Sequence, residues 1–206
     1  MVQAQKTKNR GRPRTITRER ITDVGIRMGL PKITFVGLAA EMGVSHMALY
    51  KHVPNLKALK ALIAEAIFEH WEIPEIANPS PYKLESYLNE FALSLRNLVR
   101  LNPGLPPYLL RRSVATPHIT EKIREHQKVV AATFNLSSEN SQWLLSTIAF
   151  HCIAVADTLY SKDDETIELD RLDEEEIERE FNQGINALII GALKIMAQEE
   201  DLPSTP

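Results

Sequence analysis

The segment 45–52 carries side chains that are able to contact double-stranded DNA. At helical spacing, Leu49 lies on a buried face, and a polar, basic face is left for solvent or a partner. A short helix with such a face fits the major groove, where side chains reach base edges and phosphates. We expect His46 and Met47 to approach base edges. The side chains expected nearer the phosphates are Tyr50, Lys51 and His52.

Residues 34–44 are expected to form the helix that positions this segment. Thr34 is a good N-cap, and it is also expected to hold the helix against the DNA backbone. Apolar residues then recur at helical spacing until Gly43, which supplies the left-handed conformation that ends a helix. Ser45 is expected to cap the second helix at the DNA surface. Two short helices joined by such a tight turn predict a helix-turn-helix.

This pattern resembles the hallmarks of the tetracycline-repressor (TetR) family of transcription regulators, over roughly residues 12–71. The residues that carry the resemblance are Gly29, Thr34, Leu38, Ala39, Gly43, Val44, Ser45, Leu49, Tyr50, His52 and Leu59. The resemblance implies a helical DNA-binding head and a helical body for ligand binding and dimerisation. The family often has a lysine just inside the next helix, which this chain lacks, so that phosphate contact either passes to Lys57 or is lost.

The charge of the chain is divided between a basic and an acidic part. The formal net charge is −3, but residues 1–60 contain twelve Lys and Arg against three acidic residues. The remaining residues contain twelve basic and 24 acidic side chains. A basic head on an acidic body is typical of a protein whose head binds a polyanion.

Residues 1–14 are expected to be a disordered basic arm, because they are rich in Lys and Arg and lack apolar periodicity. The centre of the arm resembles the core of an AT-hook, which binds the minor groove. Its candidate DNA contacts are Arg10, Arg12 and Arg14. A basic tail that only stays solvated is the alternative.

Helical periodicity and stop signals predict an all-α fold of about nine helices. Beyond the first helix, at about 17–28, and the helix-turn-helix, the expected helices span about 55–71, 82–101, 105–113, 117–134, 138–160 and 173–198. Asp173 and Glu176 are expected to form a capping box at the start of the last helix.

Prolines within residues 72–81 mark a domain boundary. We expect a three-helix DNA-binding domain at 15–72 and a helical ligand-binding and dimerisation domain at 73–206. The helix 55–71 carries an apolar stripe wide enough to pack on both units. It is therefore expected to be the only helix that links them.

The last two expected helices, 138–160 and 173–198, are apolar over most of their circumference. Helices of this kind are buried on more than one side. The small residues that would let another helix approach closely are Gly184, Ala187, Gly191 and Ala192. We therefore expect a homodimer built on a four-helix bundle of these two helices.

No residue pattern in the chain is typical of an enzyme, a cofactor site or a metal site. The six histidines lack zinc-ligand spacing, and there is no phosphate-binding glycine loop or serine elbow. A single cysteine and the lack of a secretory segment favour a cytoplasmic protein. The longest charge-free run, 140–156, has 17 residues and is expected to be a buried helix rather than a membrane span.

Several polar and aromatic side chains of the body are candidates for a ligand pocket. Thr147, His151 and Thr158 lie within about 40° of one another on an otherwise apolar helix. The further candidates are Asn89, Phe91, Tyr108 and Trp143. For each of these residues, plain packing in the core is the alternative.

The sequence therefore favours a dimeric transcription regulator, a repressor that a small molecule releases from a palindromic DNA site. Two alternatives stay open at this point. One is a small helical enzyme whose head only resembles a helix-turn-helix. The other is an architectural DNA-binding dimer without a ligand.

Overall fold

The computed structural model describes residues 16–76, 81–111, 115–160 and 171–200. These residues form nine α-helices and one 3₁₀-helix and contain no strand. The predicted all-α fold is therefore confirmed.

The N-terminal head consists of short helices that pack on a longer one. These elements are α1 (Arg18–Met28), the 3₁₀-helix η1 (Leu30–Lys32), α2 (Phe35–Met42), α3 (His46–Leu49) and α4 (Leu56–His70). The side chains at the centre of this core are at most 1% exposed, namely Ile21, Leu38, Leu49, Leu59 and Ile63. Burial stabilises the fold by about 1.5–3 kcal/mol for each large apolar side chain, before the entropy cost of ordering the chain.

Helices α1 and α4 approach closely at Gly25. A Cβ atom built on Gly25 would lie only 2.4 Å from Cδ1 of Ile63. A side chain at this position would require Ile63 to move or the two helices to separate. The contact between α1 and α4 therefore depends on a glycine in the middle of α1, where glycine otherwise weakens a helix.

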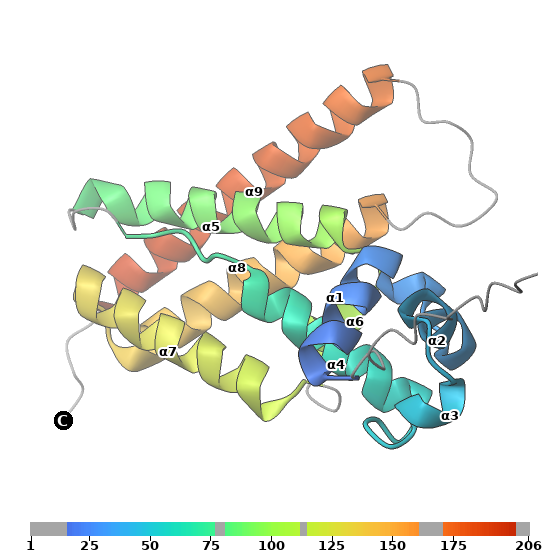
Figure 1. The fold of residues 1–206 in the computed structure, drawn as a ribbon. Helices are drawn as coiled ribbons and strands as arrows, with labels where there is room; N and C mark the ends of the chain where they lie inside the picture. The colour runs from blue at the N-terminus through green and yellow to red at the C-terminus, as the bar shows by residue number, and fades with distance from the viewer. Residues whose placement is uncertain (1–15, 77–80, 112–114, 161–170, 201–206) are drawn as a thin grey trace, which may run out of the picture.

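The body is built from five further helices, α5 (Pro81–Leu101), α6 (Pro106–Leu110), α7 (Pro117–Phe134), α8 (Ser138–Tyr160) and α9 (Arg171–Glu200). Helix α8 packs against α5, α6, α7 and α9. The fully buried side chains of its core include Leu88, Leu144, Ile148, Cys152, Ala156 and Ile189. Figure 1 shows α2 and α3 at one end of the molecule and α7 at the other, while α8 and α9 run across the body and α4 reaches from the head toward α7.

The cores of the head and the body meet around the C-terminal half of α4. Helix α4 packs against α7 as well as α1, and the head core also contains Leu98, Leu105 and Ile119 from the body. The prediction that the helix 55–71 is the only link is therefore wrong, because α5 and α7 reach the head core too. The domain boundary near residue 72 stays a prediction.

Most helix ends lie within two residues of the predicted ones, but the ends of α3 and α6 lie further away. Helix α3 has only four residues, and α6 ends at Leu110, with 112–114 outside the described residues. Helix α9 already includes Arg171, so Asp173 lies inside the helix and the predicted capping box is wrong. The unpredicted η1 contains Pro31, whose fixed φ suits the first turn of a helix.

Helix α8 is, within the described part of the chain, the one helix long and apolar enough to cross a membrane. This criterion considers only length and composition, and the core helix of a soluble protein also meets it. Only a third (33%) of its most apolar 18-residue window is buried, but four helices of the body pack against it. We therefore keep the interpretation of α8 as a core helix.

Candidate DNA-binding surface and ligand cavity

The turn between α2 and α3 has the local geometry that the sequence predicts. Oγ1 of Thr34 accepts a hydrogen bond of 3.0 Å from the amide of Gly37 and caps α2. Gly43 ends α2 in the left-handed conformation with φ 66°. Oγ of Ser45 accepts a hydrogen bond of 3.2 Å from the amide of Ala48 and caps α3. These three positions fix the angle at which α3 leaves the head.

One further hydrogen bond and one glycine support the geometry of the helix-turn-helix. The guanidinium of Arg20 on α1 donates a hydrogen bond of 2.6 Å to the carbonyl of Met42, where a cation suits the negative end of the α2 dipole. Gly37 leaves space for the Thr34 cap, because a Cβ atom there would lie 2.9 Å from Oγ1 of Thr34. The glycine within α2 is therefore explained by the cap of the same helix.

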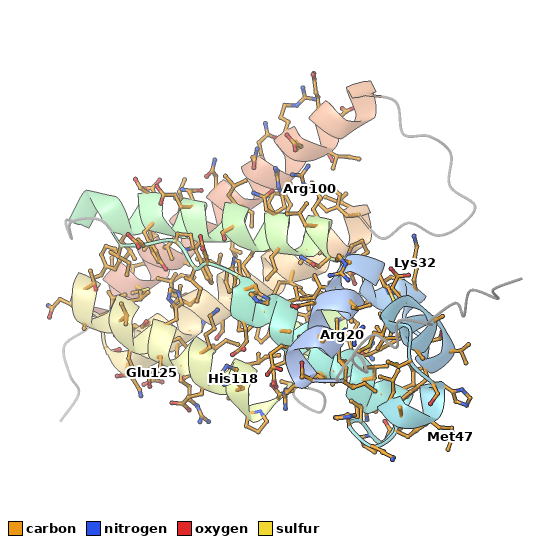
Figure 2. The ribbon with its side chains drawn as sticks, in the orientation of Figure 1. Arg20, Lys32, Met47, Arg100, His118 and Glu125 are labelled. Carbon is orange, nitrogen blue, oxygen red and sulfur yellow. The ribbon has the colours of Figure 1, made fainter. Side chains whose placement is uncertain are left out.

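All the candidate DNA contacts that the structure describes are exposed to solvent. They are Thr34, Ser45, His46, Met47, Tyr50, Lys51, His52 and Lys57. The side chain of Met47 is 63% exposed, and Figure 2 shows it at the outer end of the head, away from the body. The arm residues Arg10, Arg12 and Arg14 lie outside the described residues.

Tyr50 has a structural contact that the sequence did not indicate. Its ring stacks on Phe35 at a centroid distance of 4.2 Å and an interplanar angle of 5°, while 47% of the residue stays exposed. Helix α3 ends at Leu49, so Lys51 and His52 lie in the following turn rather than on the helix. Their assignment to phosphates stays a prediction.

At the other end of α4, the amine of Lys122 on α7 holds three backbone carbonyls. Nζ donates hydrogen bonds of 3.0, 2.9 and 2.9 Å to the carbonyl oxygens of Phe68, Glu69 and Trp71. These oxygens lie at the C-terminal end of α4, where few backbone donors remain and where a cation is favourable. The carbonyl of Phe68 also accepts a hydrogen bond of 3.3 Å from the amide of Trp71. Burial lowers the pKa of Lys122, and the charge of Glu69 opposes that shift.

Two more contacts join the end of α4 to the body. The indole N–H of Trp71 donates a hydrogen bond of 2.7 Å to Oγ of Ser94 on α5. The imidazole of His118 on α7 contacts the carboxylate of Glu69. The last turn of α4 is thus attached to both α5 and α7.

A cavity of about 560 Å³ lies beside this junction, enclosed by residues from α4 to α8. Its volume is within the range usual for small-molecule sites. The apolar and aromatic lining on the side of α4, α5 and α6 consists of Phe68, Trp71, Ile73, Phe91, Leu95, Leu109 and Leu110. The polar lining comes entirely from α7 and α8, namely Thr120, Arg124, His126, Gln127, Gln142 and Ser146.

His126 is held in the cavity wall by two aromatic neighbours. Its Nε2 atom and the hydroxyl of Tyr87 are hydrogen-bonded at 3.0 Å, and its ring stacks on Phe91 at 5.3 Å. Burial lowers the pKa of His126 to about 4, and burial together with the charge of Glu90 raises the pKa of Tyr87. Both rings are therefore neutral at pH 7. A neutral imidazole accepts a hydrogen bond at one nitrogen and donates one at the other.

Of the seven residues predicted to bind a ligand, only Phe91 lines the cavity. Outside its lining lie Asn89, Tyr108, Trp143, Thr147, His151 and Thr158. Tyr108 packs against the head core, and His151 is exposed beside Gly184 of α9. Their role in ligand binding stays a prediction that this cavity does not support.

A second, more open hollow of about 790 Å³ lies between α1, α4 and α5. Trp71 lines both this hollow and the cavity. Its indole therefore separates the interior of the body from the outer surface of the junction.

Sequence reasoning did not single out Lys122, Arg124, His126 or Gln127. In the sequence these residues look like the polar side of an amphipathic helix, and such residues usually face solvent. Only the packing of α7 against α4 and α8 shows that part of this polar side faces inward.

No protein-family model matches the sequence, and no curated protein matches it significantly. Solved structures do match the fold. A TetR variant from Acinetobacter baumannii AYE in complex with minocycline has a TM-score of 0.66 and 18% identity, covering 88% of this chain and 98% of that chain. ActR from Streptomyces coelicolor, a TetR family protein in complex with actinorhodin, has a TM-score of 0.67 and 20% identity, covering 87% and 98%.

The chain has the fold of TetR-family regulators. The transcriptional regulator SCO7222 from Streptomyces coelicolor, a further TetR, aligns with a TM-score of 0.59 and 17% identity over 86% of this chain and 98% of its own. The resemblance found in the sequence of the head thus extends over most of the chain. In this TetR fold, the described cavity lies within the body and the helix-turn-helix lies at the far end of α4.

We predict that the free energy of unfolding depends on pH through His126. The folded-state pKa is about 4, below the ordinary 6.5, so the unfolded chain binds more protons between these values. Stability should therefore fall by about 2 kcal/mol as the pH drops from 7.5 to 5. Urea unfolding at equal protein concentration should show that His126→Gln removes this part of the pH dependence. An unchanged pH profile in the variant would contradict the prediction.

We predict that Lys122→Met lowers the free energy of unfolding by about 2 kcal/mol, because three carbonyl oxygens lose a charged donor. Urea titration at pH 7.5 measures this change. The control is Lys128→Met on the same helix, where the lysine is exposed and pairs with Glu125 only three residues away. That variant should leave stability almost unchanged. Equal effects of the two substitutions would refute the role of Lys122 at the junction.

Proposed function

We propose that this chain is a cytoplasmic, ligand-responsive transcriptional regulator that binds DNA as a homodimer. It acts as a repressor that leaves a palindromic operator when a small molecule occupies the body. The observation that carries the proposal is that the end of α4 forms part of the cavity wall, while its other end supports the helix-turn-helix. A molecule in the cavity thus touches the element on which the head rests.

The head has the parts that major-groove binding requires. Helix α3 is capped and projects from a buried core, and its outward residues His46 and Met47 are exposed. We assign base-edge contacts to these two residues and phosphate contacts to Thr34, Tyr50 and Lys51. Supporting phosphate contacts are assigned to Ser45, His52 and Lys57. We retain the arm with Arg10, Arg12 and Arg14 as a minor-groove contact on the composition of residues 1–14.

Small-molecule control is supported by the cavity and by what the structural neighbours bind. The TetR variant was solved with minocycline and ActR with actinorhodin. The present cavity has its apolar wall on Phe68 and Trp71, next to the carbonyls held by Lys122. An occupant that presses on this wall shifts the end of α4, and the spacing of two recognition helices then no longer fits successive major grooves.

Dimerisation is proposed through α8 and α9, within 138–160 and 173–198. Both helices keep large apolar side chains exposed, with Phe150 at 51% and Ile190 at 57%. A Cβ atom built on Gly191 meets nothing within 4 Å, so this side of α9 leaves room for close approach of a second helix. Ala192 is only 4% exposed and belongs to the core instead. A symmetric pairing of the exposed sides would bury them.

Selection of bound fragments from random DNA tests the DNA-binding part of the proposal. We expect a palindrome with half-sites about one helical turn apart. Lys51→Ala should weaken binding to all sequences and reduce the salt slope by about 1, whereas His46→Ala or Met47→Ala should change base preference. Lys128→Ala in the body is the matched control and should change neither. Intact affinity and preference in all three head variants would contradict the groove assignment.

Titration of operator affinity tests the coupling. Compounds from a general screen that bind the body should lower operator affinity about 5- to 150-fold, which corresponds to a coupling of about 1–3 kcal/mol. Fluorescence anisotropy of labelled operator DNA at fixed salt measures the change. Constant affinity with a cavity-bound compound would favour an architectural DNA-binding dimer over a ligand-responsive regulator.

A further inference from the structure

We propose that the cavity selects flat aromatic molecules that are uncharged or acidic and rejects cations. This inference rests on the proposed function, because it names the chemical class of the effector. It is drawn from the described lining residues. The side of α4, α5 and α6 contributes only apolar and aromatic side chains, whereas α7 and α8 contribute the hydrogen-bonding groups together with apolar side chains such as Ile123, Leu145 and Ile153.

The apolar wall indicates an aromatic or flat apolar body. The ring centroids of Phe68 and Trp71 lie 5.3 Å apart, and those of Trp71 and Phe91 lie 6.1 Å apart. Three neighbouring rings therefore line one side of the cavity. The indole N–H of Trp71 already donates a hydrogen bond to Ser94 and is therefore not available to a ligand. This wall therefore offers contact area and ring packing but no free hydrogen-bonding group.

The opposite wall indicates a polar edge that carries acceptors or an acid. Gln127 and Ser146 are joined only by a long contact of 3.5 Å, so both retain capacity for a ligand. The side chain of Arg124 is 65% exposed, and its guanidinium lies 3.7 Å from the carboxylate of Glu121, which is a weak ion pair. It is thus able to turn toward an anionic group, which guanidinium binds well.

The same lining is unfavourable for a cation. Among the described residues that line the cavity, none is Asp or Glu, so a buried ammonium would have no counter-charge. Aromatic rings alone can attract cations. Here, however, Nζ of Lys122 already lies 5.4 Å from the centroid of Phe68, and Arg124 adds a second positive charge nearby. Glu69 near Lys122 and Glu121 beside Arg124 partly compensate these charges, but neither carboxylate lines the cavity, where it could receive a cation.

Three probes that share one aromatic body test this selectivity on the full chain. They are anthracene-2-carboxylate, anthracene-2-carboxamide and anthracen-2-ylmethylammonium, each followed by the anisotropy of its own fluorescence at pH 7.5. We expect the carboxylate and the carboxamide to bind at least about tenfold more tightly than the ammonium probe. Equal or tighter binding of the ammonium probe would overturn the inference while leaving the cavity as a ligand site.

Matched variants locate the binding and the charge effect. Arg124→Gln should weaken the carboxylate about three- to fivefold and leave the carboxamide within about twofold, the size expected for a partly exposed ion pair. Lys128→Gln, which lies outside the lining, should change neither probe. An equal loss for the two probes in Arg124→Gln would contradict the charge assignment.

Ala149→Phe, which fills the cavity, should abolish binding of both favoured probes, and Ser146→Phe serves the same purpose if the first variant fails to fold. Binding that persists in a folded filled variant would overturn the assignment to this cavity. Failure of all three probes to bind the parent chain would overturn this inference, and the general screen for compounds that bind the body would decide the small-molecule part of the proposed function separately. The selection from random DNA would still decide the DNA-binding part separately.

Discussion

The arrangement of head and body depends on the C-terminal end of α4, which the amine of Lys122 binds beside the apolar core that the two parts share. The last carbonyls of a helix have few partners within it, and in this chain a cation from α7 donates hydrogen bonds to three carbonyls at the end of α4. Because Trp71 is also bonded to Ser94, the end of α4 is attached to α7 on one side and α5 on the other. The position of the head relative to the body is therefore set at the same point where the cavity begins.

Helix α7 contributes to two structures at once. Through Lys122 it binds the end of α4. Through Thr120, Arg124, His126 and Gln127 it supplies most of the polar lining of the cavity. The spacing of these residues puts them on neighbouring turns of a single rigid helix. A shift of α7 that follows a change in the cavity lining therefore also shifts Lys122 and its contact with α4, and no intermediate side chains are needed.

The parts of the site that sequence reasoning found are those fixed by local chemistry. Caps such as Thr34 and Ser45 act within four residues, so their type and spacing were sufficient to place them. The junction and the cavity depend on pairs far apart in the chain, as in the bond between Tyr87 and His126. A helical wheel gives the relative directions of Thr147, His151 and Thr158 but not which side of α8 faces inward. His151 and Thr158 in fact face outward.

The close contact at Gly25 between α1 and α4 favours motion of the head together with α4. Ile63 of α4 packs directly against Gly25 of α1, so we expect α1 to move together with α4. Helix α4 has 15 residues. At 1.5 Å per residue it is about 22 Å long, and a tilt of about 5° at one end moves the other by about 2 Å. Displacements too small to disturb the packing of the body are thereby amplified at the outer surface of the head.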